Sequence, residues 1–177
     1  MKIPALLPMI LLSIALPVFA GIISVRLDVD PRSKSKGNPT APGKPPSEKT
    51  QEQSLMIKLF NTSTESIGDL TVKYWFFARD IKGHGSTVFK QGESRTSLEK
   101  NERKTVESET VTTKYTDAYT KFEASGPNKT QKATRVPAVG QKLTGYAVQV
   151  LNGGKVISEY YSDNSYKQMV AGTAPAK

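Results

Sequence analysis

Short stretches in which apolar and polar residues alternate constrain this fold more than any other feature of the sequence. In the clearest stretch, five apolar residues share one side and two aromatic residues lie on the other: Leu70, Val72, Tyr74, Phe76 and Ala78 on the first side, Trp75 and Phe77 on the second. A period of two places successive side chains on opposite faces of a β-strand. Because this stretch is apolar on both sides, we expect it to be a central strand.

Weaker alternation predicts further strands along the chain. Residues 21–30 form an N-terminal strand with Ile23, Val25, Leu27 and Val29 on one side. Residues 55–60 form another, which ends at the polar corner 61–66. A tight connection at 80–85 leads to a short strand at 87–91, and the polar turn 99–102 leads to an exposed strand near a sheet edge at 105–113.

The surest local structure is a β-hairpin near the C-terminus. Tyr146, Val148 and Val150 alternate before Asn152-Gly153-Gly154, and a second strand runs from 156 to 161. Glycines supply the positive φ that tight hairpin turns require. A three-residue loop would pair Val150 with Val156, whereas a two-residue loop would shift the pairing by one residue, so the pattern leaves the register open.

Three segments lack such alternation. Residues 31–53 hold five prolines among Lys, Ser and Thr and no large apolar residue, which predicts a flexible linker. Residues 116–141 contain Gly126-Pro127-Asn128 and a surplus of cations, which predicts a long basic loop of the kind that is usually functional or disordered. Residues 168–177 are expected to form a flexible C-terminal tail.

About seven short strands without sustained helical periodicity predict an all-β protein. The expected architecture is a single immunoglobulin-like antiparallel β-sandwich at 54–167, with an N-terminal strand at 21–30 attached through the flexible linker 31–53. The chain has no cysteine, so neither disulfides nor thiolate metal ligands contribute. Stability must come from packing.

The first twenty residues predict export. Lys2 precedes an apolar run that ends at Pro17-Val18-Phe19-Ala20, ahead of Gly21, and the small side chains at this junction suit cleavage after Ala20. A membrane anchor is the alternative, but this run is shorter than the roughly 20 apolar residues of a spanning helix and is interrupted by prolines. We therefore expect a signal peptide at 1–20 and a periplasmic or extracellular product without a transmembrane segment.

Groups suited to catalysis are scarce. His84 is the only histidine and lies in a glycine-flanked turn, where a solvated loop residue is the simpler interpretation. Two acidic pairs with i, i+2 spacing, Asp28/Asp30 and Glu107/Glu109, are typical of the solvated face of a strand. We predict that the protein is not an enzyme and has no catalytic, cofactor-binding or metal-binding residues.

Charge indicates what the protein could bind. The net charge of +9 favours anionic partners, although interspersed acids and the lack of a nucleic-acid motif disfavour DNA and RNA. The contact residues predicted for a protein partner or an acidic glycan are the cations of segment 116–141 and two tyrosines: Lys121, Lys129, Lys132, Arg135, Tyr119 and Tyr161. Tyrosines can stack on sugar rings or anchor a protein surface.

Three segments of the chain form one pattern: the strand and Asn-Thr-Ser corner at 55–63, the apolar strand at 70–74 and the polar turn with its following strand at 97–106. Together they resemble bacterial immunoglobulin-like domains of the CARDB type. A weaker likeness is to small exported immunoglobulin-like proteins that accompany type IV pilus machinery. The resemblance implies a noncatalytic interaction or structural module that binds envelope or pilus proteins, or itself by donating the N-terminal strand. Acidic-glycan binding is the alternative function.

Overall fold

A computed structural model describes residues 24–37, 46–125 and 130–172. The first strands are β1 (Val25–Lys36), β2 (Lys49–Asn61), β3 (Ile67–Asp80), β4 (Ser86–Leu98) and β5 (Arg103–Glu107). They are followed by β6 (Val111–Thr116), β7 (Tyr119–Ser125), β8 (Thr130–Val136), β9 (Val139–Asn152), β10 (Lys155–Tyr161) and the short helix α1 (Tyr166–Gly172). The expected signal peptide at 1–20 and the contact residue Lys129 lie outside the described residues.

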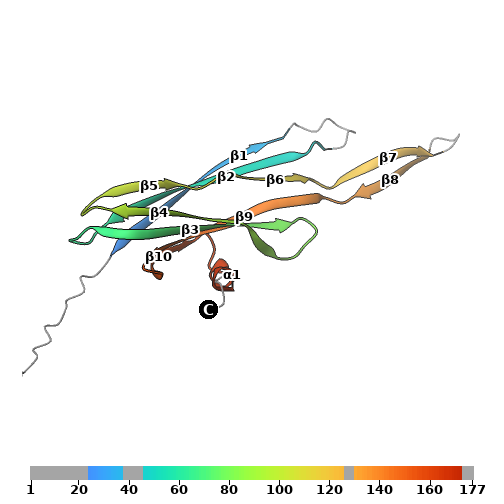
Figure 1. Cartoon of the computed structure of the whole chain (residues 1–177). Coiled ribbons are helices and arrows are strands. Elements are labelled where there is room, and N and C mark those ends of the chain that lie inside the picture. The colour runs from blue at the N-terminus through green and yellow to red at the C-terminus, as the bar shows by residue number, and fades with distance from the viewer. Residues whose placement is uncertain (1–23, 38–45, 126–129, 173–177) are drawn as a thin grey trace, which may run out of the picture.

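The strands form an antiparallel β-sandwich, as the sequence predicts (Figure 1). In the first sheet β2 lies between β1 and β5. The second sheet has the order β4-β3-β9-β10. Strand β6 continues the line of β5 along β2 and also pairs with the start of β9, which joins the two sheets at one end. Seven strand positions, three facing four, match the immunoglobulin-like arrangement.

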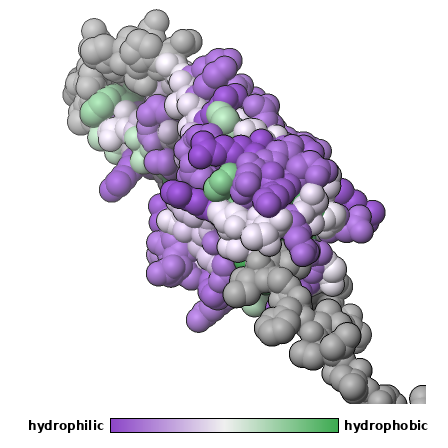
Figure 2. Space-filling view, turned by 90° about the vertical axis from the view of Figure 1, so that its left-hand side faces the viewer, coloured by the Kyte–Doolittle hydropathy of each residue, from purple (hydrophilic) through white to green (hydrophobic). Residues whose placement is uncertain are grey.

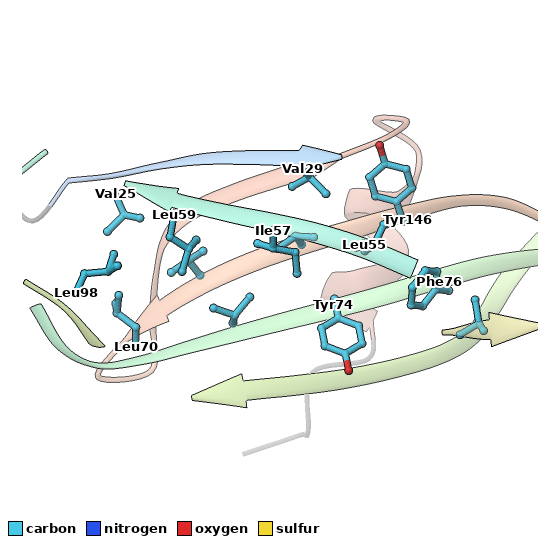
Figure 3. Close-up of a cluster of buried hydrophobic side chains, with 14 of the residues drawn as sticks. Val25, Val29, Leu55, Ile57, Leu59, Leu70, Tyr74, Phe76, Leu98 and Tyr146 are labelled. Atoms are coloured by element: carbon cyan, nitrogen blue, oxygen red, sulfur yellow. The ribbon is translucent and has the colours of Figure 1, made fainter. Parts of the chain in front are cut away.

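Hydrophilic residues cover most of the end of the sandwich where β1, β3 and β5 begin (Figure 2). The apolar side chains instead fill the space between the two sheets, where β2 contributes Leu55, Ile57 and Leu59 (Figure 3). Strand β3 supplies the face predicted from its alternation, Leu70 to Ala78, and Phe76 is fully buried there. Burying one large apolar side chain contributes roughly 1.5–3 kcal/mol, so this core between the sheets, the larger of two apolar clusters, is the main source of stability.

The other face of β3 is buried by helix α1, which the sequence analysis did not predict. Trp75 and Phe77 form a second apolar cluster with Tyr166 and Val170 of the helix. The rings of Phe77 and Tyr166 stack with centroids 4.0 Å apart. The expected flexible tail at 168–177 is therefore wrong as far as Gly172. A helix of seven residues is too short to show the helical period of an amphipathic segment.

The predicted flexible linker at 31–53 is wrong at both of its ends, and its middle part, 38–45, lies outside the described residues. Strand β1 continues from Pro31 to Lys36, β2 begins at Lys49, and the two pair residue by residue from Val25↔Asn61 to Lys36↔Thr50. Pro31 is tolerated because β1 is an edge strand, where a missing N–H need not break the ladder. Because β1 is already paired within its own chain, this arrangement gives strand donation no support.

The predicted long loop at 116–141 is also wrong on both sides of 126–129, which lie outside the described residues. Strands β7 and β8 pair with each other from Tyr119↔Val136 to Ser125↔Thr130 as a separate two-stranded hairpin. This hairpin projects from the end of the sandwich (Figure 1). Neither of its faces is covered by the core, so its sequence carries no apolar alternation.

The structure settles the register of the C-terminal hairpin. Gly153 and Gly154 have φ values of 55° and 81°, and Asn152 pairs with Lys155 across this two-residue turn. A bulge between Val156 and Ser158 then shifts the pairing, so that Tyr160 lies opposite Val148. Strand β4 is also longer than the predicted strand at 87–91. The prediction stopped short because the residues from 92 to 97 are polar and show no apolar alternation.

Candidate functional site

The predicted contact residues of the β7–β8 hairpin lie on two opposite faces. Lys121 is opposite Thr134, and Lys132 is opposite Glu123, which places both lysines on the face that also carries Tyr119. Arg135 is opposite Thr120 and belongs to the other face. The structure therefore brings these cations onto one element without forming a single cationic surface.

Glu123 reduces the positive charge of the first face. Its carboxylate lies 2.5 Å from the ammonium of Lys121. The hydrogen bond between them lowers the pKa of Glu123 and raises the pKa of Lys121. Both groups are exposed, so the pair contributes little to stability.

Tyr161 is not part of this hairpin. It lies on β10, where its hydroxyl accepts a hydrogen bond from Gln149 Nε2 at 2.9 Å and donates one to Glu159 at 3.0 Å. Burial raises the pKa of Tyr161, and the ammonium of Lys167 lies 5.9 Å from its ring centroid. Its role is to close the outer face of the second sheet beside α1.

Phe122 is a hairpin residue that the sequence analysis missed. Its side chain is 60% exposed, the largest value among the exposed large apolar residues of the described chain. It lies opposite Ala133 on the face that carries Arg135. The signal in the sequence was a phenylalanine within a strongly polar segment. Because this segment was predicted to be a loop, there was no reason to expect the Phe122 side chain to project from the face of a strand.

A second candidate site lies on the outer face of the first sheet. Register places Arg26 of β1, Phe60 of β2 and Arg103 of β5 in one row across three strands. The guanidinium of Arg103 lies 5.0 Å from the Phe60 ring centroid. An open groove of about 430 Å³ surrounds this row, and its remaining lining residues are Asp28, Lys58, Leu59, Lys104 and Thr105.

Asn61 fixes the position of this row. Its backbone N–H donates to Glu102 O at 3.0 Å, and its side-chain Nδ2 donates to Glu99 O at 2.9 Å and to Glu65 O at 2.7 Å. These bonds tie the end of β2 to the turn before β5, so that Phe60 lies beside Arg103. The buried Asn61 is thus a corner residue, and its amide is already occupied.

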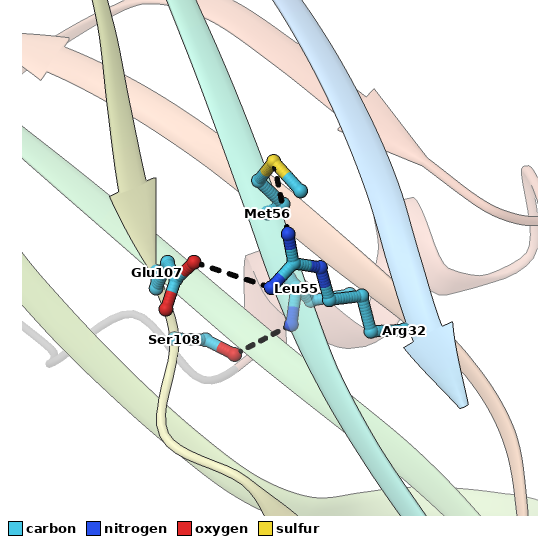
Figure 4. A network of polar contacts seen from close by, with 5 residues as sticks. All are labelled: Arg32, Leu55, Met56, Glu107 and Ser108. Atoms are coloured by element: carbon cyan, nitrogen blue, oxygen red, sulfur yellow. Dashed lines mark hydrogen bonds and ion pairs between the residues drawn. The ribbon is translucent and has the colours of Figure 1, made fainter. Parts of the chain in front are cut away.

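Most other charges on this sheet face are paired. Lys58 contacts the carboxylate of Asp30, which raises the pKa of the ammonium, and lies 3.9 Å from Asp28. Arg32 lies 3.4 Å from Glu107 and donates to the sulfur of Met56 at 3.7 Å (Figure 4). No ion pair of Arg26 or Arg103 is found with any described residue, so their charges are available to a ligand.

The acidic pairs and the histidine are not brought together. Asp28 and Asp30 share Lys58, whereas Glu107 faces Arg32 and Glu109 contacts Lys90. His84 lies exposed between β3 and β4. No group of three potential metal ligands occurs in the described part of the chain. None of the helices within the described ranges is long and apolar enough to cross a membrane.

Comparison with known proteins assigns no function to either candidate site. No protein-family model and no curated protein matches the chain. A crystal structure from Akkermansia muciniphila is similar over 82% of this chain and 72% of its own, with 13% sequence identity and a TM-score of 0.38. A likeness this weak says nothing of what the protein does. The immunoglobulin-like assignment rests on the strand order of the chain itself.

Proposed function

We propose that this is a noncatalytic exported protein of the bacterial envelope or cell surface, which uses its immunoglobulin-like sandwich to present an interaction surface. The observation that supports this most is the β7–β8 hairpin, which extends beyond the sandwich and pairs only with itself. An isolated two-stranded hairpin is marginally stable in water. Contact with a partner would stabilise it.

The hairpin carries residue types that bind proteins well. Phe122 is largely exposed, and Arg135 lies diagonally across from it on the same face. Aromatic residues and arginine are enriched in the cores of protein interfaces. The family resemblance makes envelope and pilus proteins the partners to expect.

Photo-crosslinking in the producing cells tests this surface. A photoreactive phenylalanine derivative, p-benzoylphenylalanine, replaces Phe122 in one variant and Phe89 in a matched control. Phe89 is also an exposed phenylalanine, at 37%, but lies on β4 of the sandwich. We expect a crosslinked product of discrete mass, containing an envelope protein, from position 122 only. Equal products at both positions, or none at 122, would contradict the proposal.

Export has a separate test. The protein is produced with its natural N-terminus, and the intact mass of the periplasmic or extracellular fraction is measured. Cleavage after Ala20 predicts a mature chain that begins with Gly21. Recovery of the uncleaved chain in the cytoplasm would exclude export without affecting the crosslinking result.

A further inference from the structure

The groove around Arg26, Phe60 and Arg103 lies where β1 and β5 begin and β2 ends. Figure 1 shows this end of the sandwich opposite the β7–β8 hairpin. Its central row is built by strand register, because Phe60 pairs with Arg26 on one side and with Arg103 on the other. The next row of the same face consists of Asp28, Lys58 and Thr105. Residues far apart in sequence therefore form one surface.

The groove concentrates positive charge. Its lining includes the cations Arg26, Lys58, Arg103 and Lys104 and one carboxylate, Asp28. Lys58 is offset by the aspartates of β1, and the ammonium of Lys104 donates to Ser97 O at 3.2 Å. The two arginines, which flank the aromatic ring, are thus the groups best placed to receive an anion.

We propose that this groove binds a carboxylated sugar, such as a uronic acid residue within an acidic polysaccharide. A guanidinium binds a carboxylate through two parallel hydrogen bonds. Asp28 and Thr105 add hydrogen-bond acceptors in the neighbouring row, which suit the hydroxyl groups of a sugar. A densely charged polyphosphate would place negative charge against Asp28. A carboxylated sugar carries its carboxylate and its hydroxyl groups on one ring, so that the carboxylate can face the arginines while the hydroxyl groups face Asp28.

The dimensions fit this ligand class. The volume of about 430 Å³ is within the roughly 300–1,000 Å³ of small-molecule sites. Because the groove is open on a sheet surface, an internal residue of a polymer can enter it. Phe60 supplies an apolar ring between the two arginines, against which the apolar face of a sugar ring can pack.

Binding of oligogalacturonate, measured by isothermal titration calorimetry at fixed salt, tests the proposal. The double variant Arg26→Gln/Arg103→Gln removes both arginines from the groove. Arg79→Gln/Arg95→Gln is the matched control, since these arginines are also exposed strand residues and the net charge falls equally. We expect the Kd to rise at least tenfold in the first variant and less than twofold in the second.

Two further ligands distinguish the recognition of a carboxylated sugar from nonspecific electrostatic attraction between a polyanion and the basic protein. The methyl ester of oligogalacturonate lacks the carboxylate charge and should bind at least tenfold more weakly. Polyglutamate carries carboxylates without sugar rings and should also bind more weakly than oligogalacturonate. The proposal is overturned if the unmodified protein does not bind oligogalacturonate, if both double variants lose affinity equally, or if the ester or polyglutamate binds as tightly.

Discussion

Replacement of Asn61 by alanine should strongly destabilise the sandwich. Its fully buried side chain makes four hydrogen bonds. The amide Nδ2 donates to Glu65 O and Glu99 O, and Oδ1 accepts from the backbone N–H and the hydroxyl of Ser63, at distances between 2.6 and 2.9 Å. At roughly 1 kcal/mol for each bond, the free energy of unfolding should fall by about 3–4 kcal/mol.

Urea denaturation of the purified protein, followed by Trp75 fluorescence, measures this loss. For a chain of this size each kcal/mol lowers Tm by about 2–4 °C, so a thermal scan should shift by about 10 °C. Thr62→Ala is the neighbouring control: its exposed hydroxyl makes one bond, to Ser24 O at 3.0 Å, and should contribute at most about 1 kcal/mol.

Asn61→Asp tests the reasoning further at nearly constant volume. The carboxylate keeps the bonds from Ser63 but faces the carbonyl oxygens of Glu65 and Glu99 without donors. It should cost at least as much as alanine at pH 7. A loss below about 1 kcal/mol for Asn61→Ala, with an unchanged dependence on urea, would refute the view that these bonds hold the corner.

Three other substitutions test separate parts of the structure. Gly92→Ala should cost roughly 1–3 kcal/mol in urea denaturation, because a Cβ would lie 2.4 Å from the Tyr74 hydroxyl oxygen; Gly85→Ala, with nothing within 4 Å, should be nearly neutral. Tyr166→Ala should cost about 3 kcal/mol and change the near-UV circular dichroism, since it removes the ring stacked on Phe77, whereas the exposed Gln168→Ala should do neither. Burial, and secondarily a hydrogen bond with Tyr160, raise the pKa of Tyr146. As the pH rises above about 10, the Tyr146 hydroxyl therefore loses its proton in the unfolded chain before it does so in the folded protein. The free energy of unfolding should fall in this pH range, and it should fall less in Tyr146→Phe than in the unmodified protein.

Local patterns predicted the sandwich because its central strands are buried on at least one face. The alternation from Leu70 to Ala78 correctly gave both faces of β3, and Asn152-Gly153-Gly154 gave the final turn. The polar halves of β1 and β2 and the β7–β8 hairpin were missed for the opposite reason. Their strands are held by backbone pairing outside the main core, so no apolar period marks them.

The two candidate sites also differ in how far the sequence could predict them. Sequence identified the cations of the hairpin as neighbours because they are close along the chain, but register separated them onto two faces. It could not bring Arg26, Phe60 and Arg103 together, since only the pairing of β1 and β5 with β2 makes them adjacent.

The sequence by itself determined the all-β class, the central strand and the final hairpin turn, because alternation and glycine act over a few residues. Only the tertiary structure decided which strands pair, where α1 packs and which charges meet. Those features depend on contacts between distant segments, and no local period encodes them.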